Sequence, residues 1–150
     1  MTDIIVSQAT NKDIQSITQL LEILFTQEAD FEPQPEKQAQ AIADIVSHPE
    51  KGHFLLLRHQ QKVIGAVSLL YIPSTAMGGQ SALLEDMIIS PDFRGKGYGR
   101  QLLNAAVEFA QQQGCLRLTL LTDKSNMIAQ KMYKQLGFEY SAMLPMRLVF

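Results

Sequence analysis

Three glycines and three cationic side chains fall within seven consecutive residues, in the stretch "RGKGYGR" at 94–100. An amphipathic helical pattern follows at once, with apolar residues at Leu102, Leu103 and Ala106. Glycines let consecutive backbone N–H groups converge at the start of a helix, where the helix dipole adds positive potential. The stretch therefore predicts a turn that binds phosphate groups, and its charge suits a diphosphate. The alternative is a solvated glycine turn with incidental basic residues.

The same stretch does not match three better-known motifs. A dinucleotide fingerprint GxGxxG fails because Arg100 and Leu102 stand where the third glycine is required. A P-loop fails because Gly97, and not Ser or Thr, follows the Gly-Lys pair. The GxSxG pattern of a nucleophilic serine is broken by Leu83. Rossmann-type binding, P-loop hydrolysis and serine hydrolysis are thus disfavoured.

Two adjacent carboxylates, Glu85 and Asp86, interrupt the otherwise apolar run "SALLEDMIIS". An unpaired charge in such a strand costs free energy unless it has a partner or a chemical use. Strand alternation points the two side chains to opposite faces, so at most one is expected to face a given cleft, unless a β-bulge changes their faces. The pair is therefore a candidate for a chemical role, the alternative being a paired or partly solvated structural carboxylate.

Periodicity and turn residues predict one domain over residues 1–150. We expect strands in "IIVSQ", "HFLLLR", "VIGAVSLLYI", "SALLEDMIIS", "CLRLTLLT", "FEYSAM" and "PMRLVF", with "PSTAMGGQ" as a turn-rich loop. We expect helices from Thr10 or Asn11 to about Gln27, from about Glu36 to Val46, after the glycine-rich stretch as far as Gly114, and from about Met127 to Leu136. This order predicts an α/β fold with a mixed sheet and helices on both faces.

Composition excludes several classes of function. The chain has 150 residues, 46% of them hydrophobic, and a net charge of -2, which argues against a general nucleic-acid binder. One cysteine, Cys115, and three scattered histidines give no zinc spacing, so no metal is expected. The longest apolar run, 63–72, is about half of what a membrane helix needs. No targeting segment is apparent at the N-terminus, so we expect a cytoplasmic protein without a membrane anchor.

Two motifs in sequence order, with a strand between them, resemble the GNAT superfamily of acyl-CoA-dependent N-acyltransferases. The first, RxxGxG, appears as Arg94, Gly97 and Gly99, directly after a strand. The second consists of Asn126, Ala129 and Tyr133, followed by "LGF". The resemblance is clearest over residues 82–140. It implies the GNAT acyl-CoA N-acyltransferase fold, with a central, mostly antiparallel sheet of six to seven strands.

The resemblance also implies a coenzyme A site. The backbone amides of the turn would hold the coenzyme A pyrophosphate; these residues are Arg94, Gly95, Lys96, Gly97, Tyr98, Gly99 and Arg100. The pantetheine arm would pair like an extra strand with the backbone around Met87, Ile88 and Ile89. Asn126 and Ala129 would lie beside that arm, although Asn126 is equally well explained as a helix N-cap.

The catalytic roles follow from the resemblance as well. Tyr133 would protonate the departing thiolate of coenzyme A, and an acidic residue, for which we favour Glu85 over Asp86, would act as general base. A primary amine, on a small molecule or a protein, would attack acetyl-CoA directly in a ternary complex, with a backbone N–H near Met87 polarising the thioester carbonyl. The alternatives are an inactive acyl-CoA sensor and a transferase for longer acyl groups.

The acceptor amine is not specified by the sequence. We expect its pocket to be lined by the first two helices, the acidic link with Asp30, Glu32 and Glu36, the "PSTAMGGQ" loop and the terminal strand pair. Charges in such a link are more often simply solvated. A homodimer is possible, with the apolar segments "LLYI" and "MLPMRLVF" contributing to its interface.

Overall fold

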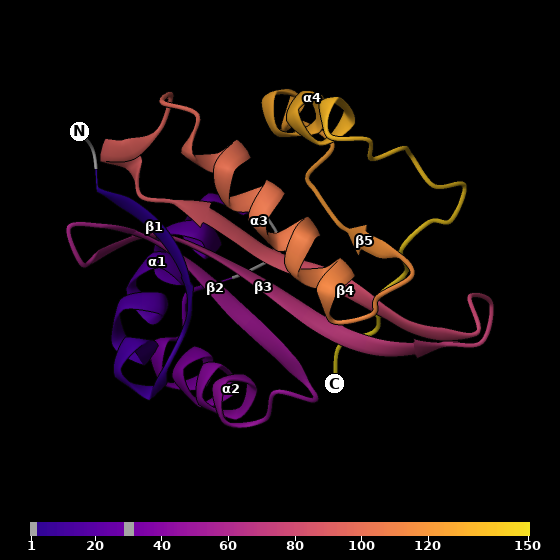
Figure 1. The fold of residues 1–150 in the computed structure, drawn as a ribbon, viewed down its shortest axis with the longest axis horizontal. Coiled ribbons are helices and arrows are strands. Elements are labelled where there is room, and N and C mark those ends of the chain that lie inside the picture. Colours follow the sequence, from indigo (N-terminus) through magenta and orange to yellow (C-terminus); the bar gives the residue numbers. More distant parts are fainter. Residues whose placement is uncertain (1–2, 29–31) are drawn as a thin grey trace.

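The computed structural model describes residues 3–28 and 32–150. Its centre is a sheet of five strands in the order β1-β2-β3-β4-β5 (Figure 1). The strands are β1 (Ile4–Gln8), β2 (Gly52–His59), β3 (Lys62–Ser74), β4 (Gly79–Ile89) and β5 (Leu118–Leu120). Neighbours from β1 to β4 are antiparallel, and β5 is parallel to β4.

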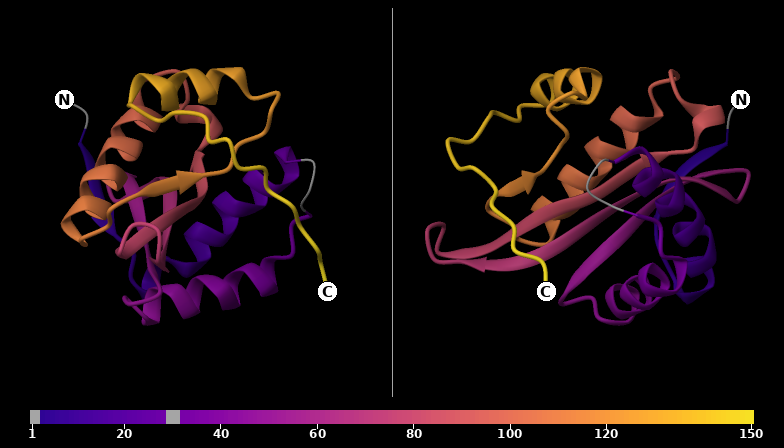
Figure 2. Two further views of the ribbon diagram at one scale, coloured as in Figure 1. Left: turned by 90° about the vertical axis from the view of Figure 1, so that its right-hand side faces the viewer. Right: turned by 180° about the vertical axis from the view of Figure 1, so that it is seen from behind.

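Helices cover both faces of this sheet. The helices are α1 (Ile14–Gln27), α2 (Pro35–Ser47), α3 (Tyr98–Gln112) and α4 (Met127–Gln135). Helices α1 and α2 cover one face, where Ile17 of α1, Ile42 of α2 and Ile88 of β4 are buried in one cluster. Helix α3 packs on the other face, where Leu102 and Leu103 are fully buried. Helix α4 lies on the same side of the sheet as α3, and its residues Met132 and Tyr133 pack against this core (Figure 2). The two cores confirm the expected mixed α/β fold with helices on both faces.

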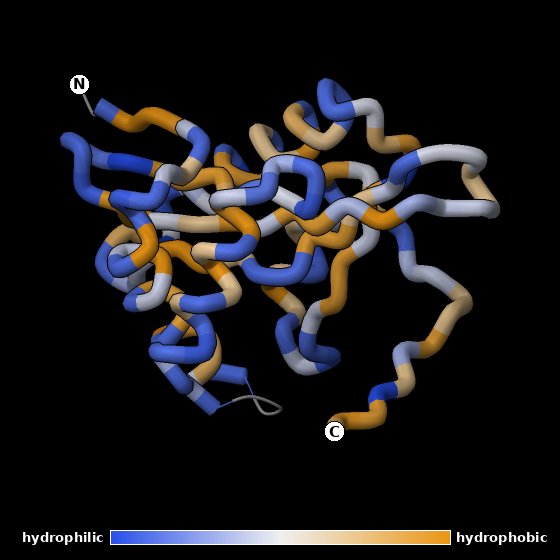
Figure 3. The backbone as a smooth tube through the Cα atoms, turned by 90° about the horizontal axis from the view of Figure 1, so that it is seen from below, coloured by the Kyte–Doolittle hydropathy of each residue, from blue (hydrophilic) through white to orange (hydrophobic). Residues whose placement is uncertain are grey.

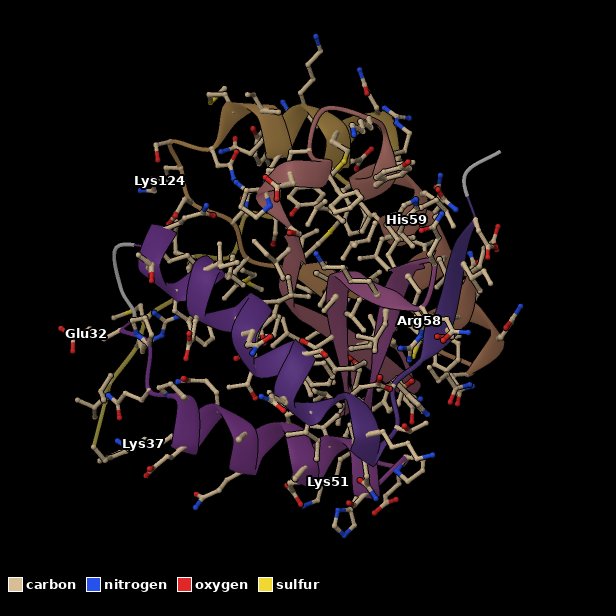
Figure 4. The ribbon with its side chains drawn as sticks, turned by 90° about the vertical axis from the view of Figure 1, so that its left-hand side faces the viewer. Glu32, Lys37, Lys51, Arg58, His59 and Lys124 are labelled. Atoms are coloured by element: carbon tan, nitrogen blue, oxygen red, sulfur yellow. The ribbon has the colours of Figure 1, made fainter. Side chains whose placement is uncertain are left out.

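The start of α1 is fixed by a capping box joined to a salt bridge. The side chains and backbones of Thr10 and Asp13 cap each other around a short 3-10 turn. Arg58 of β2 reaches Asp13 through two hydrogen bonds of 2.9 and 3.0 Å, and also donates to Ser7 (Figure 4). Burial alone would raise the pKa of Asp13, but the hydrogen bonds from Arg58 and Thr10 outweigh it and lower that pKa. This network ties α1 to β1 and β2.

Strands β4 and β5 pair only over a short stretch. Ala82, Leu83 and Leu84 align with Leu118, Thr119 and Leu120, and the pairing ends there. Beyond Leu84, β4 continues for five residues beside β3 alone. The β4 edge that faces away from β3 is therefore open from Glu85 to Ile89.

A β-bulge interrupts the pairing of β3 with β4 at the point where β5 departs. Val67 pairs with Met87 and Leu69 with Leu84, so the single residue Ser68 stands opposite both Glu85 and Asp86. The Ser68 hydroxyl accepts a hydrogen bond of 3.1 Å from the Asp86 amide. The extra residue changes which face the following side chains occupy.

Two sequence expectations differ from the structure. Residues 138–150 belong to no helix or strand, so the sheet has five strands in the described part of the chain and not six to seven. The apolar, β-prone composition of "FEYSAM" and "PMRLVF" predicts strands, and this prediction is wrong, because a strand also needs a neighbour to pair with. The expected "PSTAMGGQ" loop is shorter in the structure, because β3 extends to Ser74 and β4 starts at Gly79. The two strands form a hairpin around a tight turn in which Gly78 has a φ angle of 71°.

Candidate functional site

The glycine-rich stretch forms the turn expected from the sequence. After a 3-10 turn at Pro91–Phe93, Gly95 and Gly97 adopt left-handed φ angles of 75° and 84°. Gly97 is the N-cap of α3. A side chain at either position would strain the backbone, which explains why glycine occupies both. Gly99, in the first turn of α3, lies against Met87 of β4 and Met132 of α4.

Six consecutive backbone amides at this turn donate no hydrogen bond to another backbone group. The Arg94 amide donates to the Pro91 carbonyl, and the Gln101 amide donates to the Gly97 carbonyl. Between them lie residues 95–100, of which the last three form the first turn of α3 and have no intrahelical acceptor for their amides. The amide of Arg94 is thus engaged, and the available cluster is one residue shorter than the sequence indicated.

The three cationic side chains of the turn have different surroundings. Arg94 donates from Nε to the Ile89 carbonyl at 2.9 Å, and its terminal nitrogens lie against the Gln27 amide of α1. Arg100 donates to the Gln135 side chain of α4. Lys96 is exposed, with its Nζ 5.6 Å from the Phe93 ring centroid. Arg94 therefore pins the turn to the sheet, while Lys96 leaves its charge at the surface.

The open edge of β4 presents main-chain groups of two residues named from the sequence. The Ser90 amide donates to the Ile64 carbonyl, which fixes the hydrogen-bonded register of β3 and β4. In that register Ile88 bonds toward β3, whereas the main-chain groups of Met87 and Ile89 point away from it. The Arg94 side chain already uses the Ile89 carbonyl. Met87 and Ile89 can therefore receive another extended chain, and Ile88 cannot.

Both carboxylates of β4 line the same cavity, contrary to the expectation that alternation would separate them. The bulge at Ser68 places Glu85 and Asp86 on the α1 and α2 side, in a cavity of about 320 Å³. Its apolar wall includes Leu21, Phe25 and Phe54. Glu85 is exposed and Asp86 is half-buried.

Asp86 has the electrostatic surroundings of a base. Burial, followed by the nearby charges of Glu85 and Glu28, raises the pKa of Asp86 from 3.8 to about 7, against a smaller opposing effect of Ser68. A carboxyl group with that pKa can take up and release a proton near neutral pH. The sequence named this residue as the second choice after Glu85.

Tyr133 of α4 lines a second cavity, of about 570 Å³. The cavity is also bordered by β5 and by the chain after α4, including Phe138. The rings of Phe138 and Tyr133 meet edge to face, with their centroids 5.9 Å apart. Burial, followed by the Glu28 carboxylate, raises the pKa of Tyr133 above its ordinary value. The phenol is thus kept protonated.

Glu28, which was not singled out from the sequence, acts electrostatically on both Asp86 and Tyr133. Its charge raises the pKa of Asp86 in one cavity and of Tyr133 in the other. A glutamate at the end of an amphipathic helix, before a polar link, gives no sequence signal that separates it from a solvated residue. Ser68 was missed for a similar reason, since a serine inside an apolar strand does not by itself indicate a β-bulge.

The remaining sequence candidates occupy the start of α4 and the acidic link. The Asn126 side chain accepts a hydrogen bond of 3.2 Å from the Ala129 amide, which confirms the N-cap interpretation. Of the acidic link, Glu32 lines the smaller cavity with Lys37, and Asp30 lies outside the described residues. Where the chain is described, the turn after Ser74 borders neither cavity.

The described residues hold neither a membrane span nor a metal cluster. Over 3–28 and 32–150, no helix has the length and apolar character needed to cross a bilayer. Within the same ranges, no three side chains of His, Cys, Asp or Glu gather closely enough to bind a metal ion.

Comparison with known proteins gives consistent results. The family model described as "Acetyltransferase (GNAT) family" matches residues 14–138. An uncharacterized N-acetyltransferase of Bacillus subtilis, YhfO, is 30% identical over 136 residues, covering 89% of each chain. A thialysine N-epsilon-acetyltransferase of Bos taurus is 29% identical over 96 residues, which cover 64% of this chain but only 52% of the bovine one.

Solved structures share the fold. A possible acetyltransferase from Clostridium difficile 630 superposes with a TM-score of 0.84 at 17% identity, covering 98% of this chain and 99% of that one. An aminoglycoside N-acetyltransferase in complex with CoA superposes with a TM-score of 0.82, also at 17% identity, covering 99% and 96%. At these identities the likeness concerns the fold alone.

Proposed function

Because the chain belongs to the acetyltransferase (GNAT) family, we propose that it moves an acetyl group from acetyl-CoA to a primary amine, by direct attack in a ternary complex. The observation that carries this proposal is the amide cluster at residues 95–100, at the N-terminus of α3 and beside the open edge of β4. Convergent amides at a helix N-terminus suit a pyrophosphate.

Coenzyme A would bind through two sets of main-chain groups. Amides 95–100 would hold the pyrophosphate, with the exposed Lys96 adding charge. Met87 and Ile89 would pair with the extended pantetheine arm as a neighbouring strand would. The side chain of Arg94 would act indirectly, by fixing the turn against Ile89.

Asp86 would be the general base for the amine. An aliphatic amine has a pKa of about 10.4, so at neutral pH nearly all of it carries a proton that must be lost before attack. Asp86 lines the 320 Å³ cavity and has a pKa of about 7, whereas the exposed Glu85 would mainly attract the cationic amine and hold the pKa of Asp86 up. The amine proton would pass to Asp86.

Tyr133 would be the general acid. Its raised pKa keeps the phenol protonated, so that it can donate to the sulfur that leaves as the thioester bond breaks. The acetyl thioester supplies the electrophilic carbon, and the Met87 amide, which points away from β3, would donate to its carbonyl oxygen.

A Tyr133→Phe variant tests this assignment. General acids typically contribute about 10²- to 10⁴-fold, so we expect release of free thiol from acetyl-CoA to fall at least tenfold across a panel of primary amines. Calorimetry should show unchanged affinity for coenzyme A. Tyr140→Phe is the matched control, because Tyr140 also borders the larger cavity but bonds to Gln130. Full activity in Tyr133→Phe would remove the acid, and binding without thiol release with any amine would indicate a sensor.

A further inference from the structure

The 320 Å³ cavity has walls that are mostly apolar. Its hydrocarbon side chains come from both helices and from the sheet, and they include Phe25 of α1, Ile45 of α2, Phe54 of β2 and Leu70 of β3. Hydrophobic and hydrophilic residues alternate along α1 and α2 (Figure 3), as in helices that turn one apolar side toward a core. Walls of this kind favour the apolar part of a small molecule over water.

The charged groups of the same cavity favour a cation. Three carboxyl groups line it, those of Glu32, Glu85 and Asp86, against one ammonium group, that of Lys37. Glu32 and Lys37 are exposed and opposite in sign, so in water their charges largely offset each other. Glu85 and Asp86 are neighbours in β4, and the bulge brings both to this cavity. The cavity therefore offers one place for one positive charge.

The described part of the cavity has few groups that could recognise hydroxyls. The uncharged polar side chains that line it are Gln38 and Ser68. The Gln38 side-chain oxygen already accepts from the Gln34 amide, and the Ser68 hydroxyl accepts from the Asp86 amide. A ligand with several hydroxyls, or with a second cation, would bury those groups against hydrocarbon without partners. Such burial costs free energy.

We propose that the acceptor is a compact primary amine with one positive charge and an apolar body. Its ammonium group would lie at Glu85 and Asp86, and its alkyl or aromatic part would lie against Phe25 and Phe54. The volume of 320 Å³ is at the lower end of the roughly 300 to 1,000 Å³ of small-molecule sites, so the body must be small. The inference rests on the proposed function, because it names the amine of that reaction.

Two matched pairs of amines test this preference. Cyclohexylamine and glucosamine both carry one amine on a six-membered ring, but only glucosamine carries hydroxyls. An apolar pocket disfavours one added hydroxyl by up to about 100-fold, so we expect kcat/KM for thiol release to be at least about 100-fold higher for cyclohexylamine. Hexylamine should exceed hexamethylenediamine, its counterpart with a second cation, by at least about tenfold. Equal or reversed preferences in both pairs would overturn the proposal.

A substitution in α2 tests whether this cavity holds the apolar body. Ala41 lines the cavity and is exposed, so the folded chain can accept a larger side chain there that fills part of the space. We expect Ala41→Phe to lower kcat/KM for cyclohexylamine at least about tenfold and to change it little for methylamine, which has almost no body to displace. Gln40→Phe is the matched control, because Gln40 is exposed on the same helix and does not line the cavity. Equal behaviour of the two variants toward cyclohexylamine would overturn the proposal.

Binding separates this inference from the proposed function. Calorimetry with cyclohexylamine, on protein saturated with coenzyme A, needs no turnover. We expect the amine to bind wild type and Gln40→Phe alike, and Ala41→Phe at least about tenfold more weakly. This result without thiol release from any amine would contradict the proposed function and support the cavity as a site for apolar cations. An absence of binding to wild type would overturn the inference.

A peptide distinguishes a small amine from a protein acceptor. A peptide that begins with leucine also presents one amine beside an apolar group, but its chain continues beyond the cavity. We expect it to be a poorer acceptor than cyclohexylamine at equal concentration. A peptide that releases thiol more than tenfold faster would overturn the inference and leave the proposed function standing, with a protein N-terminus as its acceptor.

Discussion

At the scale of single residues, the carboxyl group of Asp86 combines a cost to folding with the proposed role of general base. It is half-buried beside Ser68, and this burial, followed by the charges of Glu85 and Glu28, raises its pKa to about 7. In the unfolded chain its pKa would be near 3.8. Between these values the folded chain holds a proton that the unfolded chain has released.

The pH dependence of the reaction should report Asp86. We expect the rate at low amine concentration to rise with pH through about 7, because Asp86 must be ionised to accept the amine proton. Asp86→Asn should lose this rise and at least about tenfold in rate. Glu85→Gln should keep the rise, shifted to lower pH because a neighbouring negative charge is removed. The reverse result, with the rise lost only in Glu85→Gln, would make Glu85 the base.

Stability should depend on Asp86 in the opposite direction from activity. Because the folded pKa is raised, the free energy of unfolding falls as pH rises from about 4 to about 7, and the cost is fully present above that range. We therefore expect Asp86→Asn to be more stable than wild type at pH 8, by up to a few kcal/mol, and similar at pH 4. Urea unfolding at both pH values measures this, with the exposed Asp92→Asn as control. A gain of equal size at both pH values would exclude ionisation as its cause.

At the scale of elements, the turn at residues 94–100 was predictable, whereas the bulge was not. The glycines at 95 and 97 signal left-handed backbone directly, and the helix pattern from Leu102 gives the direction of the amides. The bulge depends on how β3 and β4 are aligned across space, and Ser68 carries no local mark of it. For this reason the sequence located the pair of carboxylates but not their shared face.

A pair of matched glycine substitutions should separate backbone strain from ligand binding. Gly97 and Gly114 have nearly the same left-handed φ, 84° and 83°, and in both a Cβ would meet open space. Alanine should cost each about 1 kcal/mol of stability. Only Gly97→Ala should weaken coenzyme A binding, by at least about tenfold, because Gly97 caps α3 at the proposed phosphate site. Calorimetry and thermal unfolding measure the two effects. Equal affinities in the two variants would place the phosphates elsewhere.

At the scale of the whole molecule, the candidate site depends on the part of β4 that, among the described residues, pairs with a neighbouring strand on one side only. Its bonds to β3 and the packing of α1 to α3 support it while β5 departs after Leu84. The sequence predicted the helices and the first five strands because each has its own periodicity. It could not predict the fate of residues 138–150, because an extended apolar segment becomes a strand only beside an edge, and that edge is set by tertiary structure.

Hydrogen exchange should show whether the ligand pairs with the edge of β4 that β5 leaves open. With saturating acetyl-CoA and short labelling times, we expect slower exchange at residues 95–100 and at Met87 and Ile89, whose amides point away from β3. The β2 and β3 amides are already paired and serve as the internal reference at these times. At long times all core amides should slow together, by the global stabilisation that any ligand of the folded state gives. Early protection confined to other segments would contradict the strand-like pairing of the ligand, even if the protein binds it tightly.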